Sequence, residues 1–201
     1  MNESQVIEGC GPVDLFLAKQ RYKLAHKKIK SVTERNRILD IGCGGYPLFL
    51  ISTNFTEKYG LDQNIVTDGE AKVVENNITI KNYNIDNENF PFEDNFFDVV
   101  CMLAVFEHIE PDKLVDVHKD VYRILKPNGM YVMTTPTFWT AGLLSFLAKM
   151  HIISDAPIKE HKGSYKYSDV ASVLEKSSFE KEKMRHGYFE LYMNMWVTAR
   201  K

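Results

Sequence analysis

Short apolar runs alternate with longer amphipathic segments through most of the chain. We expect strands where an apolar run is short and unbroken, and helices where apolar residues recur at spacings of three and four. The runs that predict strands are 37–41, 58–62, 78–83, 96–104 and 130–135. The segments that predict helices are 13–32, 47–55, 65–75 and 111–125. This alternation predicts a parallel, doubly wound sheet that binds ligands at the carboxyl ends of its strands.

The C-terminal third departs from this alternation. Residues 138–153 are largely apolar and predict a lid-like insertion within 136–166. A helix is expected over 168–176, and a closing antiparallel hairpin over 181–200 with its turn at Gly187. We therefore expect an α/β fold with a mostly parallel sheet of seven strands, a C-terminal antiparallel hairpin and helices on both faces. One domain is expected over 1–201, with an N-terminal arm and helix in 1–34.

The segment RILDIGCGGYP, over 37–47, joins the first predicted strand to a helix. Its glycines, Gly42, Gly44 and Gly45, allow a backbone to approach a ligand closely because they carry no Cβ atom. Asp40 lies just before them, and a carboxylate there suits a ligand with an amine or a hydroxyl better than a bare phosphate. A structural turn without a ligand would also account for this segment.

Two further acids end predicted strands. Asp62 closes the second strand and Asp86 follows the third. A carboxylate at the end of the second strand can accept hydrogen bonds from both hydroxyls of a ribose. The alternative for each residue is a helix cap or a turn. Asp98, at the start of the fourth strand, is expected to serve structure only.

Six segments follow one another in the order found in a known family. They are ILDIGCG, GLD, NID, FPFEDNFFDVV, LAVFEHI and LKPNGMYVMTTPT. This order resembles the type-11 group of the S-adenosylmethionine (SAM)-dependent methyltransferases of class I, which have a Rossmann-like fold. Tyr46 departs from the family's pattern, which has a third alternate glycine at that position.

The resemblance implies SAM as the cofactor and S-adenosylhomocysteine (SAH) as its product. It places Asp40 near the methionine amine, with Gly42 and Gly44 beneath the methionine portion. The remaining implied contacts are Asp62 to the ribose, Ile85 and Asp86 to the adenine, and the carbonyl of Leu103 to the amine. Gln63 is a further expected cofactor-binding residue. These residues complement the chemistry of SAM, which carries a cationic amine, two ribose hydroxyls and an adenine amino group.

No motif identifies the methyl acceptor. His108 and His161 are the candidate general bases for an oxygen or nitrogen acceptor, and the alternative is that they pack or face solvent. Relatives that bind a metal carry Glu-x-x-Glu-His, but Ala104 replaces the first of these ligands here. His118, on the helix that follows, could face solvent. We therefore expect no metal site.

Composition narrows the classes of partner. The formal net charge of −2 provides no basic field for a nucleic-acid backbone. The 3 cysteines form no CxxC pair, and neither a signal peptide nor a spanning run is seen, so a cytoplasmic protein is expected. The apolar stretch 138–153 could cover an apolar acceptor, dock to a membrane or a subunit, or pack on its own domain.

The sequence thus predicts a SAM-dependent methyltransferase that acts on a small molecule, for example an apolar compound or a sugar or lipid precursor. Two alternatives belong to other classes. One is a non-catalytic protein of the same fold that serves a partner. The other is a nicotinamide-dependent oxidoreductase, which is disfavoured because Pro47 stands where its third glycine is needed.

Overall fold

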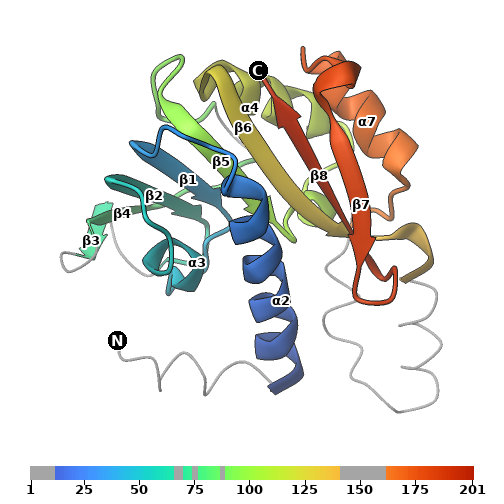
Figure 1. Cartoon of the computed structure of the whole chain (residues 1–201), viewed down its shortest axis with the longest axis horizontal. Coiled ribbons are helices and arrows are strands. Elements are labelled where there is room, and N and C mark those ends of the chain that lie inside the picture. Colours follow the sequence, from blue (N-terminus) through green and yellow to red (C-terminus); the bar gives the residue numbers. More distant parts are fainter. Residues whose placement is uncertain (1–11, 66–69, 74–76, 87–88, 141–161) are drawn as a thin grey trace.

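The computed structural model describes residues 12–65, 70–73, 77–86, 89–140 and 162–201 (Figure 1). Its α-helices are α2 (Pro12–Ile29), α3 (Leu48–Ile51), α4 (Leu114–Ile124) and α7 (Tyr167–Lys176), with 3₁₀ turns η2 (Phe106–His108) and η3 (Lys181–Lys183). Its strands are β1 (Arg37–Ile41), β2 (Glu57–Asp62), β3 (Glu70–Val73), β4 (Ile78–Asn82), β5 (Phe97–Leu103), β6 (Leu125–Pro136), β7 (Arg185–Phe189) and β8 (Asn194–Arg200). The predicted insertion falls largely on 141–161, outside the described residues.

One sheet organises the described part of the chain. Its strand order is β3-β4-β2-β1-β5-β6-β8-β7, with β3 at one edge and β7 at the other (Figure 1). Strands β4, β2, β1, β5 and β6 run parallel, whereas β8 pairs antiparallel with β6 and β7 pairs antiparallel with β8. The predicted fold class is therefore confirmed, including the C-terminal antiparallel hairpin.

Two local expectations were wrong. The helix expected over 65–75 contains a strand instead, because Glu70–Val73 pairs antiparallel with β4 and adds an eighth strand at that edge. Pairing satisfies backbone groups of β4 that would otherwise stay unpaired. Gly187 does not form the hairpin turn but lies within β7, opposite Trp196. A Cβ atom at Gly187 would lie 2.7 Å from that indole, so the indole occupies the space of a side chain.

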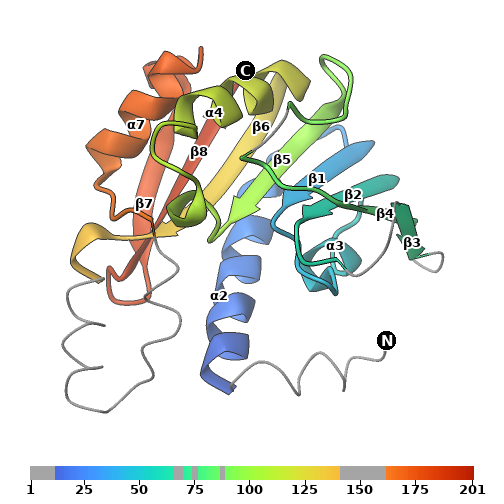
Figure 2. The same cartoon turned by 180° about the vertical axis from the view of Figure 1, so that it is seen from behind.

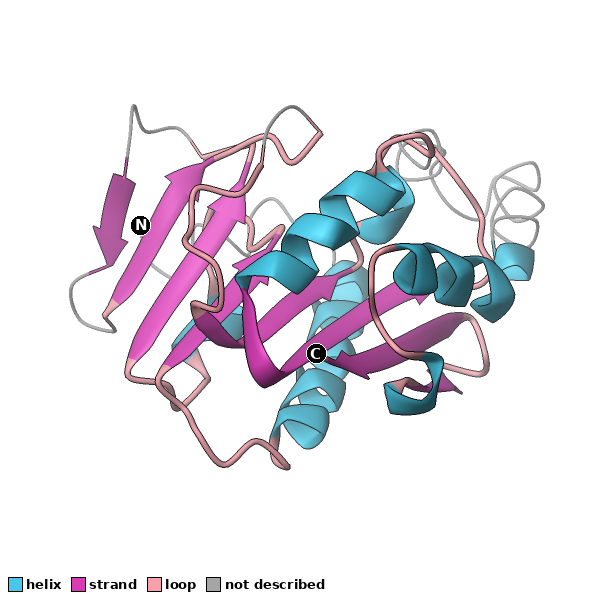
Figure 3. Ribbon diagram, turned by 90° about the horizontal axis from the view of Figure 1, so that it is seen from above, coloured by secondary structure: helices cyan, strands magenta, loops and turns pink. Residues whose placement is uncertain are grey.

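Helices cover both faces of the sheet (Figures 2 and 3). On the face of α2 and α3, the buried residues include Ala25, Ile29 and Phe49, which pack with residues of β1, β5 and β6. On the face of α4 and α7, they include Val121 and Leu174. Strands β1 and β5 contribute to both apolar clusters, since their successive side chains point to opposite faces. This double coverage leaves the ends of the strands as the place for a ligand.

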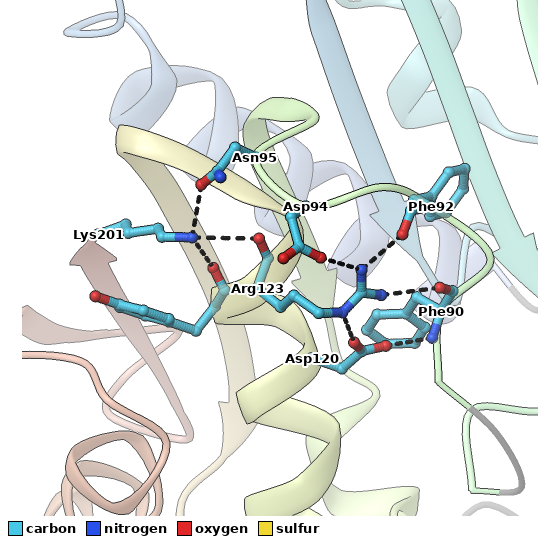
Figure 4. A network of polar contacts seen from close by, with 8 residues as sticks. Phe90, Phe92, Asp94, Asn95, Asp120, Arg123 and Lys201 are labelled. Carbon is cyan, nitrogen blue, oxygen red and sulfur yellow. Dashed lines mark hydrogen bonds and ion pairs between the residues drawn. The ribbon is translucent and has the colours of Figure 1, made fainter.

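Polar contacts with Arg123 of α4 stabilise the loop that leads into β5 (Figure 4). The Arg123 guanidinium donates to the carbonyls of Phe90 and Phe92 at 3.0 and 2.7 Å, and pairs with Asp94 and Asp120 at 2.8 and 2.5 Å. The other oxygen of Asp120 accepts from the Phe90 amide. One arginine on α4 thus contacts three residues of the segment that leads into β5, namely Phe90, Phe92 and Asp94.

Asp98 has the structural role expected from the sequence. One of its carboxylate oxygens accepts from the amides of Asn36 and Arg37 at 3.1 and 2.7 Å, and the other pairs with Lys126 at 2.5 Å. These contacts align the beginnings of β1, β5 and β6 and keep Asp98 away from the carboxyl ends of the strands.

Candidate functional site

A cleft of about 620 Å³ lies at the carboxyl ends of the parallel strands. Ligand sites in doubly wound folds lie at this edge, and this volume is in the range of small-molecule pockets. Of the residues that the sequence predicts for the site, those that line the cleft are Gly42, Asp62, Gln63, Ile85, Asp86 and His108. Asp40, Gly44 and Leu103 lie next to lining residues without lining the cleft themselves, and His161 lies outside the described residues.

The glycine turn after β1 forms one wall of the cleft. Gly42 has a φ of 77°, and a Cβ atom there would lie 2.2 Å from a methyl of Val105. Gly44 has a φ of 72°, but space around it is open. The Gly42 amide donates to the carbonyl of Leu61 at 2.7 Å, which joins the turn to β2. Both glycines are thus required by backbone conformation, and Gly42 by space as well.

Asp62, the last residue of β2, faces this turn. One of its carboxylate oxygens accepts from the Gly44 amide at 2.8 Å, and the other accepts from the Asn64 amide at 2.8 Å. The turn role that the sequence left open is therefore real. Each carboxylate oxygen has a second lone pair, so the partly exposed Asp62 can still accept hydrogen bonds from a ligand in the cleft.

Asp86 lies on the opposite wall, where a lysine reaches it. The Lys162 ammonium lies 3.3 Å from one oxygen of Asp86 and 2.8 Å from an oxygen of Glu110. The Lys162 amide also donates to the carbonyl of Glu107 at 2.8 Å. The second oxygen of Asp86 is buried and has no hydrogen-bond partner among the described residues. A ligand donor at this wall would satisfy it.

Asp40 is buried behind the glycine turn, at 4% exposure. Burial raises the pKa of its carboxyl well above the usual value, and the nearby charge of Asp62 raises it further. One of its oxygens lacks a hydrogen-bond partner among the described residues. A cationic group held close by would stabilise the charged carboxylate, so this position suits the ammonium of an amino acid.

The end of β5 carries backbone strain beside the cleft. Ala104 follows Leu103 with a φ of 58°, which a residue with a Cβ atom seldom adopts. Its amide donates to the carbonyl of Thr134 at 3.0 Å. The strained residue directs the chain so that Val105 and His108 line the cleft. Strain of this kind is concentrated at functional sites.

The segment Glu107-His108 lies between the cleft and the protein interior. His108 lines the cleft, whereas Glu107 is buried and accepts from the Thr135 hydroxyl at 3.0 Å. Burial raises the pKa of the Glu107 carboxyl. Among the described residues, no three histidine, cysteine or acidic side chains are grouped as metal ligands would be.

His118 does not face solvent, as the sequence had allowed, but is fully buried. Its Nδ1 lies 2.7 Å from the carbonyl of Leu114 and its Nε2 lies 3.0 Å from the Tyr131 hydroxyl. Burial lowers its pKa to about 4, so the ring is neutral near neutral pH. His118 therefore belongs to the core between α4 and the sheet.

Sequence reasoning missed several residues of the cleft. Val105 fills the space that Gly42 leaves, and Lys162 contacts the cleft from beyond the insertion. Neither has a local sequence signal, because each contact joins segments far apart in the chain. Asn64 and Asn84 also line the cleft; Asn64 comes two residues after the GLD segment, and Asn84 is the first residue of the NID segment.

Comparison with known proteins finds a family model that matches part of the chain. Residues 39–133 match the family model described as "Methyltransferase domain". No protein with a curated description matches the chain. In the described residues, no helix has both the length and the apolar character needed to cross a membrane.

Solved structures share the fold at low sequence identity. A SAM-dependent methyltransferase from Archaeoglobus fulgidus has a TM-score of 0.64 and 18% identity, over 95% of this chain and 100% of that one. One from Mesorhizobium loti has a TM-score of 0.63 and 17% identity, over 90% and 98%. Phosphoethanolamine N-methyltransferase 2 from Haemonchus contortus, in complex with phosphomonomethylethanolamine and SAH, has a TM-score of 0.65 and 13% identity, over 90% and 53%.

Proposed function

We propose that this chain is a class I Rossmann-like SAM-dependent methyltransferase, and that it transfers the methyl group of SAM to a small-molecule acceptor. The strongest support is that one cleft joins the glycine turn at Gly42 to the strand-end carboxylates Asp62 and Asp86. These residue types complement the amino-acid, ribose and adenine parts of SAM. Pro47 stands where the third glycine of a dinucleotide-binding turn is needed, which favours SAM over a dinucleotide.

We assign each part of the cofactor to its own wall. Gly42 and Gly44 lie beneath the methionine portion, while Asp40 and the carbonyl of Leu103 stabilise its amine. Asp62 and Gln63 hold the ribose hydroxyls. Ile85 packs on the adenine, and the unpartnered oxygen of Asp86 accepts from its amino group. The buried, unpartnered oxygens of Asp40 and Asp86 support these two assignments most directly, since both need a donor.

Bound SAM supplies an electrophilic methyl group on a sulfonium. The residues of the chain then have to align the acceptor with that methyl and exclude water. A hydroxyl or an ammonium acceptor must also lose a proton, whereas an ionised carboxylate has none to lose. We propose His108 as the base, because it lines the cleft beside the end of β5. His161 remains a second candidate from the sequence.

The acceptor class is part of the proposal. The fold neighbour from Haemonchus contortus, named for phosphoethanolamine, was solved with a small phosphorylated amine. We propose a small molecule here as well, with an apolar compound or a sugar or lipid precursor as the candidates. The net charge of −2 disfavours a nucleic acid. The free thiols of Cys43 and Cys101 are compatible with the cytoplasm as the proposed compartment.

Titration calorimetry with SAM and SAH tests the cofactor. We expect both to bind, and Asp62→Ala to weaken SAH binding by about 1–3 kcal/mol, because charge-assisted hydrogen bonds to the ribose are lost. Asp112→Ala, at an exposed acid that does not line the cleft, is the matched control and should leave the affinity unchanged. Absence of binding at high micromolar SAM and SAH would refute the proposed function.

Methyl transfer separates an enzyme from a non-catalytic protein of this fold. We expect label from methyl-labelled SAM to enter the small-molecule fraction of a cell extract, and His108→Gln to slow this transfer by a factor of about 10²–10⁴ without a change in SAH affinity. The alternative is a non-catalytic protein that serves a partner; one fold neighbour was solved with a partner, the Trm112 methyltransferase activator of Haloferax volcanii. Cofactor binding without transfer would favour that alternative.

A further inference from the structure

A second cavity, of about 340 Å³, lies between the end of β6, the start of α7 and the β7–β8 turn. Aromatic rings make up most of its wall: Phe138, Trp139, Tyr165, Tyr167, Tyr188 and Tyr192. We call this cavity the aromatic pocket. Its volume is in the range of small-ligand sites, and its wall is apolar apart from a few polar groups, as such sites usually are.

The rings of the aromatic pocket are exposed to an unusual degree. The exposed fractions are 50% for Phe138, 45% for Tyr188 and 68% for Tyr192. Single exposed apolar residues are ordinary on a protein surface, but several that share one cavity indicate a binding surface. Burying these rings against a ligand would remove apolar area from water, which favours binding.

The pocket is held in shape by its surroundings. Glu190, Leu191 and Tyr192 have φ values of 50°, 53° and 66°, so three consecutive non-glycine residues of the β7–β8 turn are left-handed. This turn is fixed to β6, because the Thr137 hydroxyl donates to the carbonyl of Tyr192 at 2.9 Å. The Tyr167 ring stacks on His186 with centroids 3.5 Å apart. Rings held in this way lose little freedom when a ligand binds.

Charge identifies the kind of ligand. Among the described residues that line the pocket, Lys166 is the only one with a charged side chain. Its ammonium lies 4.9 Å from the centroid of the Phe138 ring. An aromatic box without a lysine would suit a cationic ligand, but here the cation is already supplied by the protein. A ligand with a negative charge and a flat apolar body complements both the lysine and the rings.

We propose that the aromatic pocket binds a planar aromatic anion, such as an aromatic carboxylate that also carries a hydroxyl group, and that this molecule is the methyl acceptor. The second part rests on the proposed function. The hydroxyl oxygen forms the new bond to the methyl group as the S–CH₃ bond of SAM breaks, the hydroxyl proton passes to His108, and SAH leaves. The wall of the pocket packs on the turn that carries His108, because the Tyr165 ring lies edge-on against Phe106 at 4.9 Å and Phe106 begins that turn. His108 lines the cleft that we assign to SAM, here called the cofactor cleft. The Tyr165 hydroxyl is buried and has no hydrogen-bond partner among the described residues, so a ligand could satisfy it.

Calorimetry with 2-naphthoate tests the ligand class without any need for SAM. We expect a dissociation constant on the order of 100 µM, which is ordinary for a ligand of this size. Phenyltrimethylammonium, an aromatic cation, should bind at least about tenfold more weakly, because Lys166 repels it. Absence of naphthoate binding at millimolar concentration, or equal binding of the cation, would overturn the proposal.

Two substitutions locate the site. Lys166→Met should weaken 2-naphthoate binding about tenfold and leave the uncharged 2-naphthol unchanged, since only the charge-assisted contact is lost. Tyr188→Ala should weaken both ligands, because it removes a ring of the wall. Both side chains are exposed, so melting temperatures should stay at the wild-type value. Unchanged naphthoate affinity in Lys166→Met would refute the role of the lysine.

Titration in the presence of saturating SAH tests the acceptor role. An acceptor pocket distinct from the cofactor cleft must bind its ligand together with SAH, so the naphthoate affinity should be equal or higher in the SAH complex. Mutually exclusive binding would overturn the acceptor role. Naphthoate binding by a protein that does not bind SAH would instead refute the proposed function while leaving the ligand class intact.

Discussion

Gly42 meets two constraints at once, and a single methyl group violates both. Its φ of 77° is unfavourable for alanine, and the added Cβ would lie 2.2 Å from Val105. We expect Gly42→Ala to lower the free energy of unfolding by about 3 kcal/mol and to abolish SAH binding. Gly45→Ala is the matched control, because Gly45 lies in the same turn with open space and no positive φ. Urea denaturation and calorimetry measure both effects, and equal behaviour of the two variants would contradict the argument.

Asp40 is expected to lower the stability of the fold above its pKa and to strengthen SAH binding. Its pKa is raised by burial, so it stabilises the fold when protonated, and this contribution is lost as the pH rises through its folded-state pKa. Asp40→Asn stays neutral at every pH. The variant should therefore be more stable than the wild type at pH 8, with a smaller difference at pH 4, and should bind SAH more weakly. Urea denaturation at both pH values checks the sign, and equal stabilities at pH 8 would refute it.

The sequence revealed the parts of the site that follow local rules. Gly42, Asp62 and Asp86 could be predicted because glycine turns and strand-end acids are local patterns, and the parallel sheet brings them to one edge. Val105 and Lys162 could not, because each is defined by a contact with a distant segment. A pattern read along the chain indicates which residues face a cleft, but not which side chains reach it from elsewhere.

Helix α4 is joined to the loop before β5 mainly through Arg123 (Figure 4). Arg123→Met would keep much of the side-chain volume but leave Asp120, which is 7% exposed, without its cation. We expect a loss of about 3 kcal/mol in the free energy of unfolding, as for a broken buried ion pair. Asp94→Ala is the matched control, because Asp94 is 70% exposed and its loss should cost less than about 1 kcal/mol. Urea denaturation measures the free energy of unfolding of both variants. Equal losses in Arg123→Met and Asp94→Ala would show that the contacts of Arg123 do not stabilise the fold.

The same helix carries a pH-sensitive core residue. The pKa of His118 is lowered from 6.5 to about 4 by burial, so the unfolded chain binds this proton more readily. Stability is therefore lost as the pH falls from about 6.5 to about 4, by about 3 kcal/mol in total. His118→Gln should be less stable at pH 7 but lose less stability on acidification. Urea midpoints between pH 7 and 4 measure the two slopes, and equal slopes would refute the assignment.

Strands were easier to predict than their surroundings. The central strands are short apolar runs that are buried on both faces, and few structures other than a parallel strand produce that pattern. The segment around Glu70–Val73 was wrongly expected to be helical, because its strand state depends on pairing with β4. Likewise, the hairpin turn lies beyond Gly187 because Trp196 takes the space beside that glycine. Both errors come from tertiary partners that override local preference.

At the scale of the whole molecule, two cavities of different character lie along one edge of the sheet. The cofactor cleft lies at the ends of β1, β2, β4 and β5 and has acidic walls, with Asp62 and Asp86. The aromatic pocket lies at the end of β6 beside the β7–β8 turn, and Lys166 is its charged residue. The acids suit the cationic amine of SAM, which we propose for the first cavity, and the lysine and rings suit the anionic acceptor that we propose for the second. The antiparallel hairpin supplies part of the wall of the aromatic pocket, which the parallel strands alone could not form.

Two lysines of one segment test this separation. Lys162 pairs with Asp86 at the cofactor cleft, whereas Lys166 lines the aromatic pocket. Lys162→Met removes the partner that orients the Asp86 carboxylate, so SAH binding should weaken about threefold, a small effect because the pair is partly exposed. It should leave 2-naphthoate binding unchanged, and Lys166→Met should show the reverse pattern. Calorimetry with each ligand on each variant completes the comparison. If either substitution weakened both ligands equally, the two cavities would act as one site, and the division of the sheet edge into donor and acceptor halves would be wrong.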